Sequence, residues 1–194
     1  VNTDYALILN PDVILEKSTI EEILFAAEKV LSFAIISPLS SEKAYPNYQL
    51  DKNIKINLQS DEPFKVKSVD GYAMLLNIKK IQETLNFNHK NFFDENFFMY
   101  LENDDLCKRL IDKKENIYIV PRAKINHLGG KAVDEKYNDE IELSRNWHWM
   151  WSKFYFNKKH SGFLIAFAKS SSNFFSAVFK FLLYAITNKK LKKR

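Results

Sequence analysis

The sequence predicts an α/β fold, and three consecutive patterns near its N-terminus carry that prediction. Tyr5–Leu9 is a continuous apolar run, typical of a strand that is buried on both faces. After a loop that contains Pro11, Ser18 and Glu21 form a capping box, and apolar residues follow at helical spacing. Residues 33–36 have the pattern of a second short strand. The order strand, loop, helix, strand is typical of an α/β layer with a parallel sheet.

The rest of the chain continues this alternation after a long, turn-rich excursion at residues 37–67, which we expect to be functional or mobile. The later elements are predicted from apolar periodicity: a strand at 69–78, a short helix at 79–85, a helix at 102–114, a strand at 116–120 closed by Pro121, an extended piece at 123–127 and a long helix at 134–158. In the long helix, the spacing of Trp147 and Trp151 predicts core positions, whereas Trp149 points elsewhere, toward an acceptor or a membrane.

The composition fits one folded domain with appendages, because 46% of the 194 residues are hydrophobic and 14% are aromatic. A single cysteine excludes a disulfide framework. The net charge of +5 is unevenly distributed: residues 157–194 hold nine Lys or Arg and no acid, so residues 1–156 hold 20 basic and 24 acidic residues, a net of −4. An acidic main domain argues against a nucleic-acid partner, which requires a positive groove.

The C-terminal residues 163–186 are rich in Phe, and only Lys169 and Lys180 among them are charged. The polar segment 169–173 interrupts the apolar run, leaving two pieces that are too short to span a bilayer. We therefore expect an amphipathic segment that lies on an anionic membrane surface, followed by the basic residues 189–194. The alternative is a helix packed on the main domain with a solvated basic end.

The stretch 92–109 mixes acids with aromatic and large apolar residues, which neither a solvated run nor a plain core helix explains. Because carboxylates are costly to desolvate, acids in apolar surroundings commonly face a cation or a reacting proton. We therefore expect a site at the mouth of the core, with the acids directed at a ligand. The five acids of this stretch are Asp94, Glu95, Glu102, Asp104 and Asp105.

Three ionisable residues lie at the ends of predicted elements, where open α/β sheets bind ligands. Asp12 follows the first strand, His127 ends the extended piece, and Glu102 begins a helix. Together they could converge on a hard divalent cation that keeps positions for substrate phosphates. Each also has a plainer interpretation: Asp12 could cap a turn, and His127 could be a satisfied core histidine.

Four segments, in this order, resemble motifs of the family 2 glycosyltransferases, in particular the rhamnosyltransferase-like branch. They are Leu9-Asn10-Pro11-Asp12-Val13, Asp70-Gly71-Tyr72-Ala73-Met74, the acidic and aromatic block at 93–109, and the segment 121–130. Four motifs in order are a more specific signal than any one of them. The resemblance implies a GT-A-type, Rossmann-like mixed sheet flanked by helices, to which the C-terminal amphipathic helices are added.

The resemblance also implies an activity, the inverting transfer of a sugar from a nucleotide diphosphate sugar to a hydroxyl group. Asp12 would bind Mn²⁺ or Mg²⁺ and, through it, the diphosphate, and His127 would be a further metal contact. Glu102, Asp104 or Asp105 would remove the proton of the acceptor hydroxyl. Further contacts to the substrates are expected from Asn10, Asp70, Gly71, Asp94, Glu95 and Arg145.

The chain departs from this family in two respects. Asn103 stands where the family commonly has the acid that serves as base, so the role must pass to a neighbour, with Glu102 the first choice; alternatively, activity is lost. The nucleotide-binding first half of the family normally precedes the Asn-Pro-Asp element. We therefore expect this chain to be the C-terminal two-thirds of a longer enzyme.

On this basis the expected function is sugar transfer to a glycan or lipid-linked acceptor in cell-surface polysaccharide synthesis, at the cytoplasmic face of a membrane. The alternative is a degenerate transferase that acts as a non-enzymatic binding module. The predicted organisation has three parts: residues 1–133 as the C-terminal part of a GT-A domain, 134–160 as a packing helix, and 161–194 as a basic, membrane-associating tail.

Overall fold

The computed structural model describes residues 3–42, 45–51, 60–86, 92–129 and 138–187. Its centre is a six-stranded sheet in the order β1-β7-β3-β8-β2, with β5 also pairing with β8, and β4 and β6 form a separate two-stranded sheet. The strands are β1 Tyr5–Leu9, β2 Val13–Leu15, β3 Ile35–Ser40, β4 Tyr48–Gln49, β5 Phe64–Val66, β6 Ser68–Val69, β7 Ala73–Asn77 and β8 Ile117–His127.

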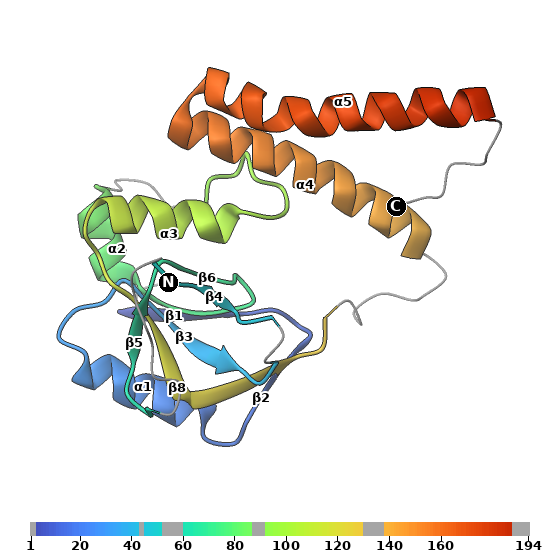
Figure 1. Ribbon diagram of the computed structural model, residues 1–194. Coiled ribbons are helices and arrows are strands. Elements are labelled where there is room, and N and C mark those ends of the chain that lie inside the picture. Colours follow the sequence, from blue (N-terminus) through green and yellow to red (C-terminus); the bar gives the residue numbers. More distant parts are fainter. Residues whose placement is uncertain (1–2, 43–44, 52–59, 87–91, 130–137, 188–194) are drawn as a thin grey trace.

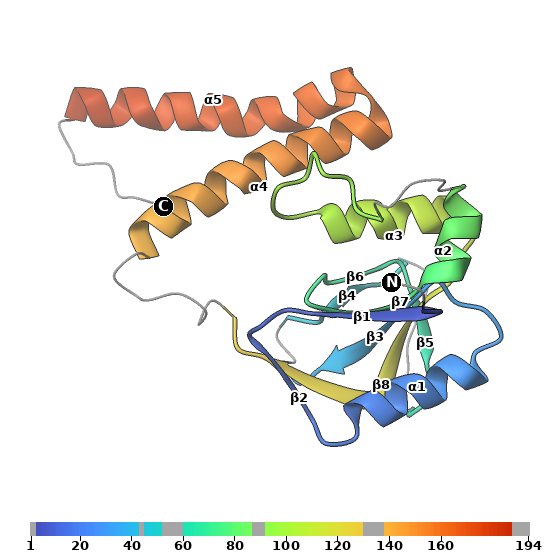
Figure 2. The ribbon, with the colours of Figure 1, turned by 180° about the vertical axis from the view of Figure 1, so that it is seen from behind.

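Helices cover both faces of the six-stranded sheet, as Figure 1 shows. On one face lies α1 (Thr19–Lys29), and on the other lie α2 (Ile78–Leu85) and α3 (Glu102–Asp112). The long helices α4 (Asn138–Ser161) and α5 (Phe163–Thr187) form a further layer beyond α3, which the view from behind in Figure 2 confirms. The predicted fold class, a mixed α/β sheet flanked by helices, is confirmed.

The expectation of a parallel layer from the first three elements is wrong in detail. Only β3 and β8 pair in parallel, whereas β1 and β3 both pair antiparallel with β7, and β2 and β5 pair antiparallel with β8. The strand expected at residues 33–36 begins at Ile35 and runs through Pro38 to Ser40. β1 and β3 are therefore parallel to each other, but β7 is inserted between them.

The strand β8 continues past Pro121 instead of ending there. Its register against β3 shifts between Pro38 and Leu39, whose partners are Val120 and Lys124. Residues 121–123 thus have no partner residue on β3, so the missing N–H of Pro121 costs no hydrogen bond with that strand. This irregularity lets one strand carry both the predicted strand at 116–120 and the predicted extended piece at 123–127.

The start of α1 also differs from its predicted capping box. The Ser18 side chain makes no capping hydrogen bond, and Thr19 Oγ1 donates instead to the Lys124 carbonyl of β8. The helix buries Ile23 and Ala26 against the sheet, where they join a core cluster. A tertiary contact to β8 therefore replaces the local cap.

The larger core cluster fills the space between the sheet and the helices α2 and α3. Leu106 and Leu110 of α3 and Ile81 of α2 are completely buried there, together with Met74 of β7 and Ile117 of β8. Burial of aliphatic side chains of this size contributes about 1.5–3 kcal/mol each. This cluster fixes the position of α3, whose N-terminus carries the predicted acids.

The two C-terminal helices are joined by a tight turn at Gly162, which has a φ of +87°. The start predicted for the first of them, at residue 134, and the predicted boundary at 133/134 lie outside the described residues, as does the basic segment 189–194. The segment 169–173 does not interrupt the helix, because α5 runs continuously from Phe163 to Thr187. Within the described ranges, neither α5 nor any other helix combines the length and the apolarity that crossing a bilayer requires.

Candidate functional site

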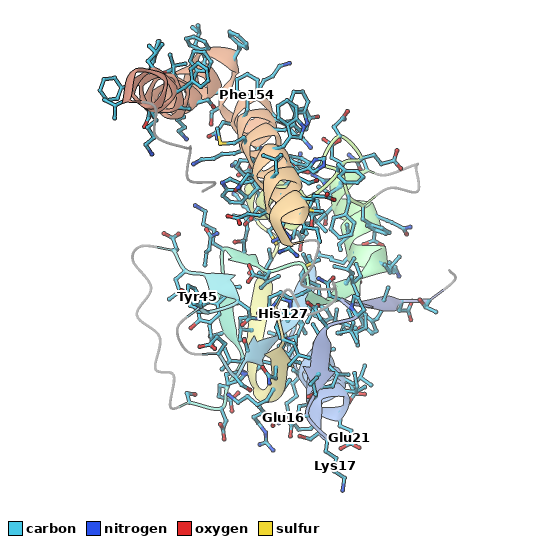
Figure 3. All side chains as sticks on the ribbon, turned by 90° about the vertical axis from the view of Figure 1, so that its right-hand side faces the viewer. Glu16, Lys17, Glu21, Tyr45, His127 and Phe154 are labelled. Carbon is cyan, nitrogen blue, oxygen red and sulfur yellow. The ribbon has the colours of Figure 1, made fainter. Side chains whose placement is uncertain are left out.

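A pocket of about 870 Å³ opens at one edge of the six-stranded sheet. The carboxyl ends of β1, β3 and β8 meet at this edge with the start of β7, because the three strands share one direction and β7 runs against β1 and β3. Most predicted site residues line the pocket: Asn10, Asp12, Asp70, Gly71, Glu102, Asp104, His127 and Arg145. Figure 3 shows His127 at the sheet, below the N-terminal end of α4 in that view.

Asp12 and His127 face each other across the paired ends of two strands. Val13 of β2 pairs with His127 of β8, and the Leu128 N–H donates to the Asp12 carbonyl over 3.0 Å. His127 Nε2 lies 3.4 Å from Asp12 Oδ2, and the imidazole stacks on the Tyr72 ring at 4.1 Å between centroids. The His127 side chain remains 28% exposed, so it is a pocket residue and not a core histidine.

The carboxylate of Asp12 is a donor that suits Mn²⁺ or Mg²⁺, and the imidazole of His127 is a ligand more typical of transition metals. No group of three or more His, Cys, Asp or Glu side chains that could hold a metal occurs in the part of the chain that the structure describes. Two protein donors fit a cation that takes its other ligands from phosphate oxygens and water. The pair therefore fits a cation that arrives with a phosphorylated ligand.

Three carboxylates, those of Asp70, Glu102 and Asp104, form the acidic side of the pocket. Desolvation by the surrounding protein raises the pKa of Asp70 and of Glu102, and the negative charge of Asp104 adds to both shifts. Desolvation also raises the pKa of Asp104, partly offset by a hydrogen bond from Ser68 and by the charge of Lys67. Glu102 Oε2 is buried and has no hydrogen-bond partner among the described residues. Such a carboxylate is suited to accept a proton from a ligand.

Asn103, which follows Glu102, ties α3 to β6 of the two-stranded sheet. Its side chain is buried, and Nδ2 donates to the Val69 carbonyl of β6 over 2.7 Å. Gly71 permits this close approach, because a Cβ at that position would lie 3.3 Å from the Asn103 Cβ and 3.6 Å from Glu102 Oε1. The amide of Asn103 therefore has a structural role, and the side chains of this turn that can react with a ligand are those of Glu102 and Asp104.

The turn before α3 carries unusual backbone geometry. Tyr100 and Leu101 have φ values of 70° and 65°, in the left-handed region that residues other than glycine rarely adopt. Each such residue costs about 1–3 kcal/mol and persists only where the surroundings enforce it. Ser152 of α4 contributes to that enforcement, because its Oγ donates to the Met99 carbonyl over 2.6 Å. Both left-handed residues line the pocket.

The helix α4 closes the pocket on the side away from the sheet. Arg145 and Trp149 line the pocket, and the Trp149 ring meets the Tyr100 ring edge to face at 5.7 Å. The prediction that Trp147 and Trp151 are core residues is wrong, because they are 70% and 50% exposed. The helix is attached to the domain by ring contacts, such as that of Tyr155 with Phe97, and by polar contacts.

Those polar contacts include Asp105, one of the predicted catalytic acids. Asp105 is fully buried outside the pocket, where α3 meets α4. Arg109 Nε lies 2.8 Å from its Oδ2, while Lys159 Nζ and His160 Nε2 lie 2.7 Å and 2.8 Å from its Oδ1. Asp105 is therefore a structural residue that joins the two helices, and it is withdrawn as a candidate base.

Asp94 and Glu95, predicted to contact substrates, also lie away from the pocket. They line a separate cavity of about 510 Å³ beside α3 and α4. Burial alone would raise the pKa of Asp94, but hydrogen bonds from Lys159, Asn96 and Tyr155 outweigh it and hold that pKa well below its ordinary value. Asp94 thus supports the attachment of α4, like Asp105.

Two residues that the sequence did not single out organise the pocket. Asn47, completely buried, donates to the Pro38 carbonyl over 2.8 Å and accepts from the Ser40 N–H over 2.9 Å, which fixes the end of β3. Tyr72 stacks on His127, and burial is the main cause that raises its pKa to about 12. Tyr72 adjoins Asp70 and Gly71, a signal that could have been used, whereas Asn47 lies in a stretch without periodicity.

Comparison with known proteins gives structural similarities and no sequence family. No family model and no curated protein matches the chain. A crystal structure of A197 from STIV aligns with a TM-score of 0.42 at 13% identity, over 68% of this chain and 59% of that one. A crystal structure of GalNAc-T7 with UDP, GalNAc and Mn²⁺ aligns with a TM-score of 0.49 at 12% identity, over 89% of this chain and 41% of that one. The chain thus spans about three-fifths and two-fifths of these two chains.

Proposed function

We propose that the protein is a glycosyltransferase of the GT-A type, which moves a sugar from a nucleotide diphosphate to a hydroxyl group. One observation carries the proposal: Asp12 and His127, at the carboxyl ends of two strands, line the same pocket as Glu102 and Asp104 at the start of α3. The resemblance of the Asn-Pro-Asp, Asp-Gly-Tyr and acidic segments to family 2 motifs supports it, because all three segments contribute to this pocket.

On the donor side, Asp12 and His127 would hold the divalent cation, with Asn10 beside them. That cation would stabilise the charge that develops on the departing diphosphate. Arg145, which reaches the same pocket from α4, adds a fixed positive charge for phosphate oxygens. The pocket thus separates a side suited to phosphates from an acidic side.

On the acceptor side, Glu102 is the proposed general base. The acceptor oxygen forms a bond with the anomeric carbon of the sugar while the bond from that carbon to the diphosphate oxygen breaks. The electron pair of the broken bond leaves with the diphosphate, and the hydroxyl proton passes to the Glu102 carboxylate. Attack from the face opposite the leaving group inverts the anomeric configuration.

The finer assignment follows from the resemblance of the motifs. We assign the protein to the rhamnosyltransferase-like branch of family 2. Its acceptor would be a glycan or a lipid-linked glycan in cell-surface polysaccharide synthesis, and the reaction would take place at the cytoplasmic face of a membrane. A second candidate is a non-enzymatic binding module, which is favoured by one observation: the residue commonly acidic in this family is Asn103, whose amide is committed to Val69.

The proposal is tested by thermal shift of the full-length protein with nucleoside diphosphates, with and without Mn²⁺. A ligand at 100 times its Kd stabilises the folded protein by about 2.7 kcal/mol. We expect a rise in Tm that requires nucleotide and cation together and that Asp12→Asn abolishes. Asp61→Asn, at a site that does not line the pocket, serves as the control and should keep the shift. Equal shifts in wild type and Asp12→Asn, or none in either, would reject the proposed donor site.

The binding module is separated from the enzyme by assay of nucleotide sugar turnover. A transferase releases nucleoside diphosphate in the presence of an acceptor, whereas a binding module shows the Tm shift without release. Shift without turnover across a panel of nucleotide sugars and acceptors would favour the second candidate.

A further inference from the structure

The helix α5 exposes apolar side chains almost over its whole length. Among its residues with described side chains, only Ala166 is buried. Seven large side chains are between 52% and 66% exposed: Phe163, Phe167, Phe174, Phe175, Phe179, Phe181 and Leu182. Contiguous apolar surface of this extent is uncommon on soluble monomers and marks a surface that binds another apolar phase.

The partner of α5 within the described chain is α4. The contacts between them lie near the turn at Gly162, where the Phe154 and Phe163 rings meet at 6.1 Å and Lys169 Nζ donates to Asn157 Oδ1 over 2.9 Å. Beyond that region α5 continues as the outermost element, on the side of α4 away from the sheet (Figures 1 and 2). The exposed Phe side chains are therefore left open by the fold.

The charge of this region selects the kind of partner. Residues 157–194 contain nine Lys or Arg and no acid. A second copy of the same surface would bring like charges together, which opposes self-association. An anionic lipid surface satisfies both features, because it takes up aromatic side chains and attracts each nearby Lys or Arg with about 1 kcal/mol, which is about a fivefold gain in affinity.

The depth of binding follows from the polar residues in the first half of α5. Lys169 and the Ser residues after it lie in the first half of the helix, and no helix in the described ranges is apolar enough to cross a bilayer. An amphipathic or aromatic helix of this kind lies in the plane of the interface. On α4, Trp147 and Trp151 add exposed aromatic side chains of the type that gathers at the membrane interface.

We propose that α5, with the outward aromatic side chains of α4, binds the surface of an anionic bilayer and holds the protein there as a peripheral protein. This proposal is independent of the transferase activity, because it concerns a different surface. It requires that both aromatic burial and positive charge contribute to the binding.

The test is flotation of the full-length protein with vesicles of phosphatidylcholine alone or mixed with phosphatidylglycerol. We expect binding to the mixed vesicles that weakens at high salt. Phe175→Ser with Phe179→Ser should lower binding at least about tenfold, and Lys180→Glu should lower it for mixed vesicles only. Phe25→Ser with Leu31→Ser removes two exposed apolar side chains from the opposite side of the sheet and should have no effect. Circular dichroism checks that each variant is folded.

Three outcomes would overturn the proposal. Vesicle binding that the Phe175 and Phe179 double variant leaves unchanged would exclude α5 as the contact. Sedimentation velocity that shows a dimer, lost in the same double variant, without vesicle binding would assign the surface to a second copy of the chain. Binding to duplex DNA at physiological salt that Lys180→Glu weakens and the double Phe variant does not would assign it to nucleic acid.

Discussion

The acids of the segment 92–109 divide into two groups that share sequence character and differ in surroundings. Glu102 and Asp104 line the pocket, where desolvation dominates and raises the pKa of each. Asp94 and Asp105 lie at the junction of α3 and α4 within 2.7 Å of Lys159 Nζ. The same type of side chain thus lies mainly desolvated at the proposed reactive site and in direct contact with a lysine at the attachment of a helix.

The comparison teaches that the cationic partner, and not the acid, decides the role. Lys159 and His160 belong to α4, far along the chain from the acids they contact. A buried carboxylate that contacts a cation is held in its charged form and can join two helices. A buried carboxylate without such a contact keeps a raised pKa and is available for proton transfer. A variant that removes an acid of the pocket should therefore lose activity and keep its stability. A variant that removes an acid at the junction of α3 and α4 should lose stability.

The largest expected effect is on activity, at Glu102. Glu102→Gln should lower kcat by about 10²–10⁴-fold, because an amide cannot accept the proton of the acceptor. Its Tm should stay close to that of wild type, since Oε2 has no hydrogen-bond partner among the described residues. The matched control is Asp112→Asn on the same helix, which removes an exposed pair with Lys108. Wild-type turnover in Glu102→Gln would eliminate Glu102 as the base.

The next largest effect is on stability, at Asp105. Asp105→Asn leaves Arg109, Lys159 and His160 without their shared carboxylate, which should cost about 3 kcal/mol of unfolding free energy, the lower end for a broken buried pair. The lower end applies because Lys159 and Arg109 keep partial access to water. Urea unfolding measures the loss, and Asp112→Asn, with a cost of about 0.3–0.5 kcal/mol, is the comparison. Equal losses in both variants would contradict the structural role of Asp105.

A smaller effect concerns the pH dependence of stability at Asp94. Because the folded-state pKa of Asp94 is below its ordinary value, its stabilisation is complete above about pH 5 and is lost as the pH falls toward the folded-state pKa. Urea unfolding from pH 5 downward should therefore show a steeper loss in wild type than in Asp94→Asn, with about pH 5–2 as the informative range. Parallel curves would show that Asp94 is not held in its ionised form.

The smallest effect tests the coupling within the pocket. Glu102 must be ionised to act as a base, so its raised pKa places the acidic limb of kcat/KM above the pH of an ordinary carboxyl group. Desolvation is the main cause of that raised pKa, and the charge of Asp104 adds to it. Asp104→Asn should therefore move the limb to lower pH in the measured profile. A limb that stays in place or moves upward would refute the coupling.

Local patterns predicted the elements well and their pairing poorly. Apolar runs identified β1, β7 and β8, and helical spacing identified α1, α3 and α4. The expected burial was wrong for two of them: β1 is an edge strand with no buried residue, and Trp147 and Trp151 of α4 are exposed. The insertion of β7 between β1 and β3 depends on contacts between distant segments, which no local period records. For the same reason the passage of β8 through Pro121 was missed, because it depends on the bulge opposite Pro38 and Leu39.

Within the candidate site, the residues adjoining strand ends were predictable and the sorting of the acids was not. Asp12, Asp70 and His127 adjoin sheet termini, and topology brings such positions together. Asp105 has the same composition around it as Asp104, yet one helical step turns it toward Lys159 and His160 of α4. The outward position of Trp147 was missed for a related reason, since which face of α4 meets the domain depends on contacts with distant residues such as Phe97 and Asp105.

The pairing of β2 with β8 has a consequence for how the protein folds. Residue 127 reaches residue 12 only through the alignment of Val13 with His127, and a slip of one residue would turn the imidazole to the other side of the sheet. Contacts so distant in sequence slow folding, because a long loop must close before they form. The paired carboxylate and imidazole therefore depend on one of the most long-range pairings of the sheet.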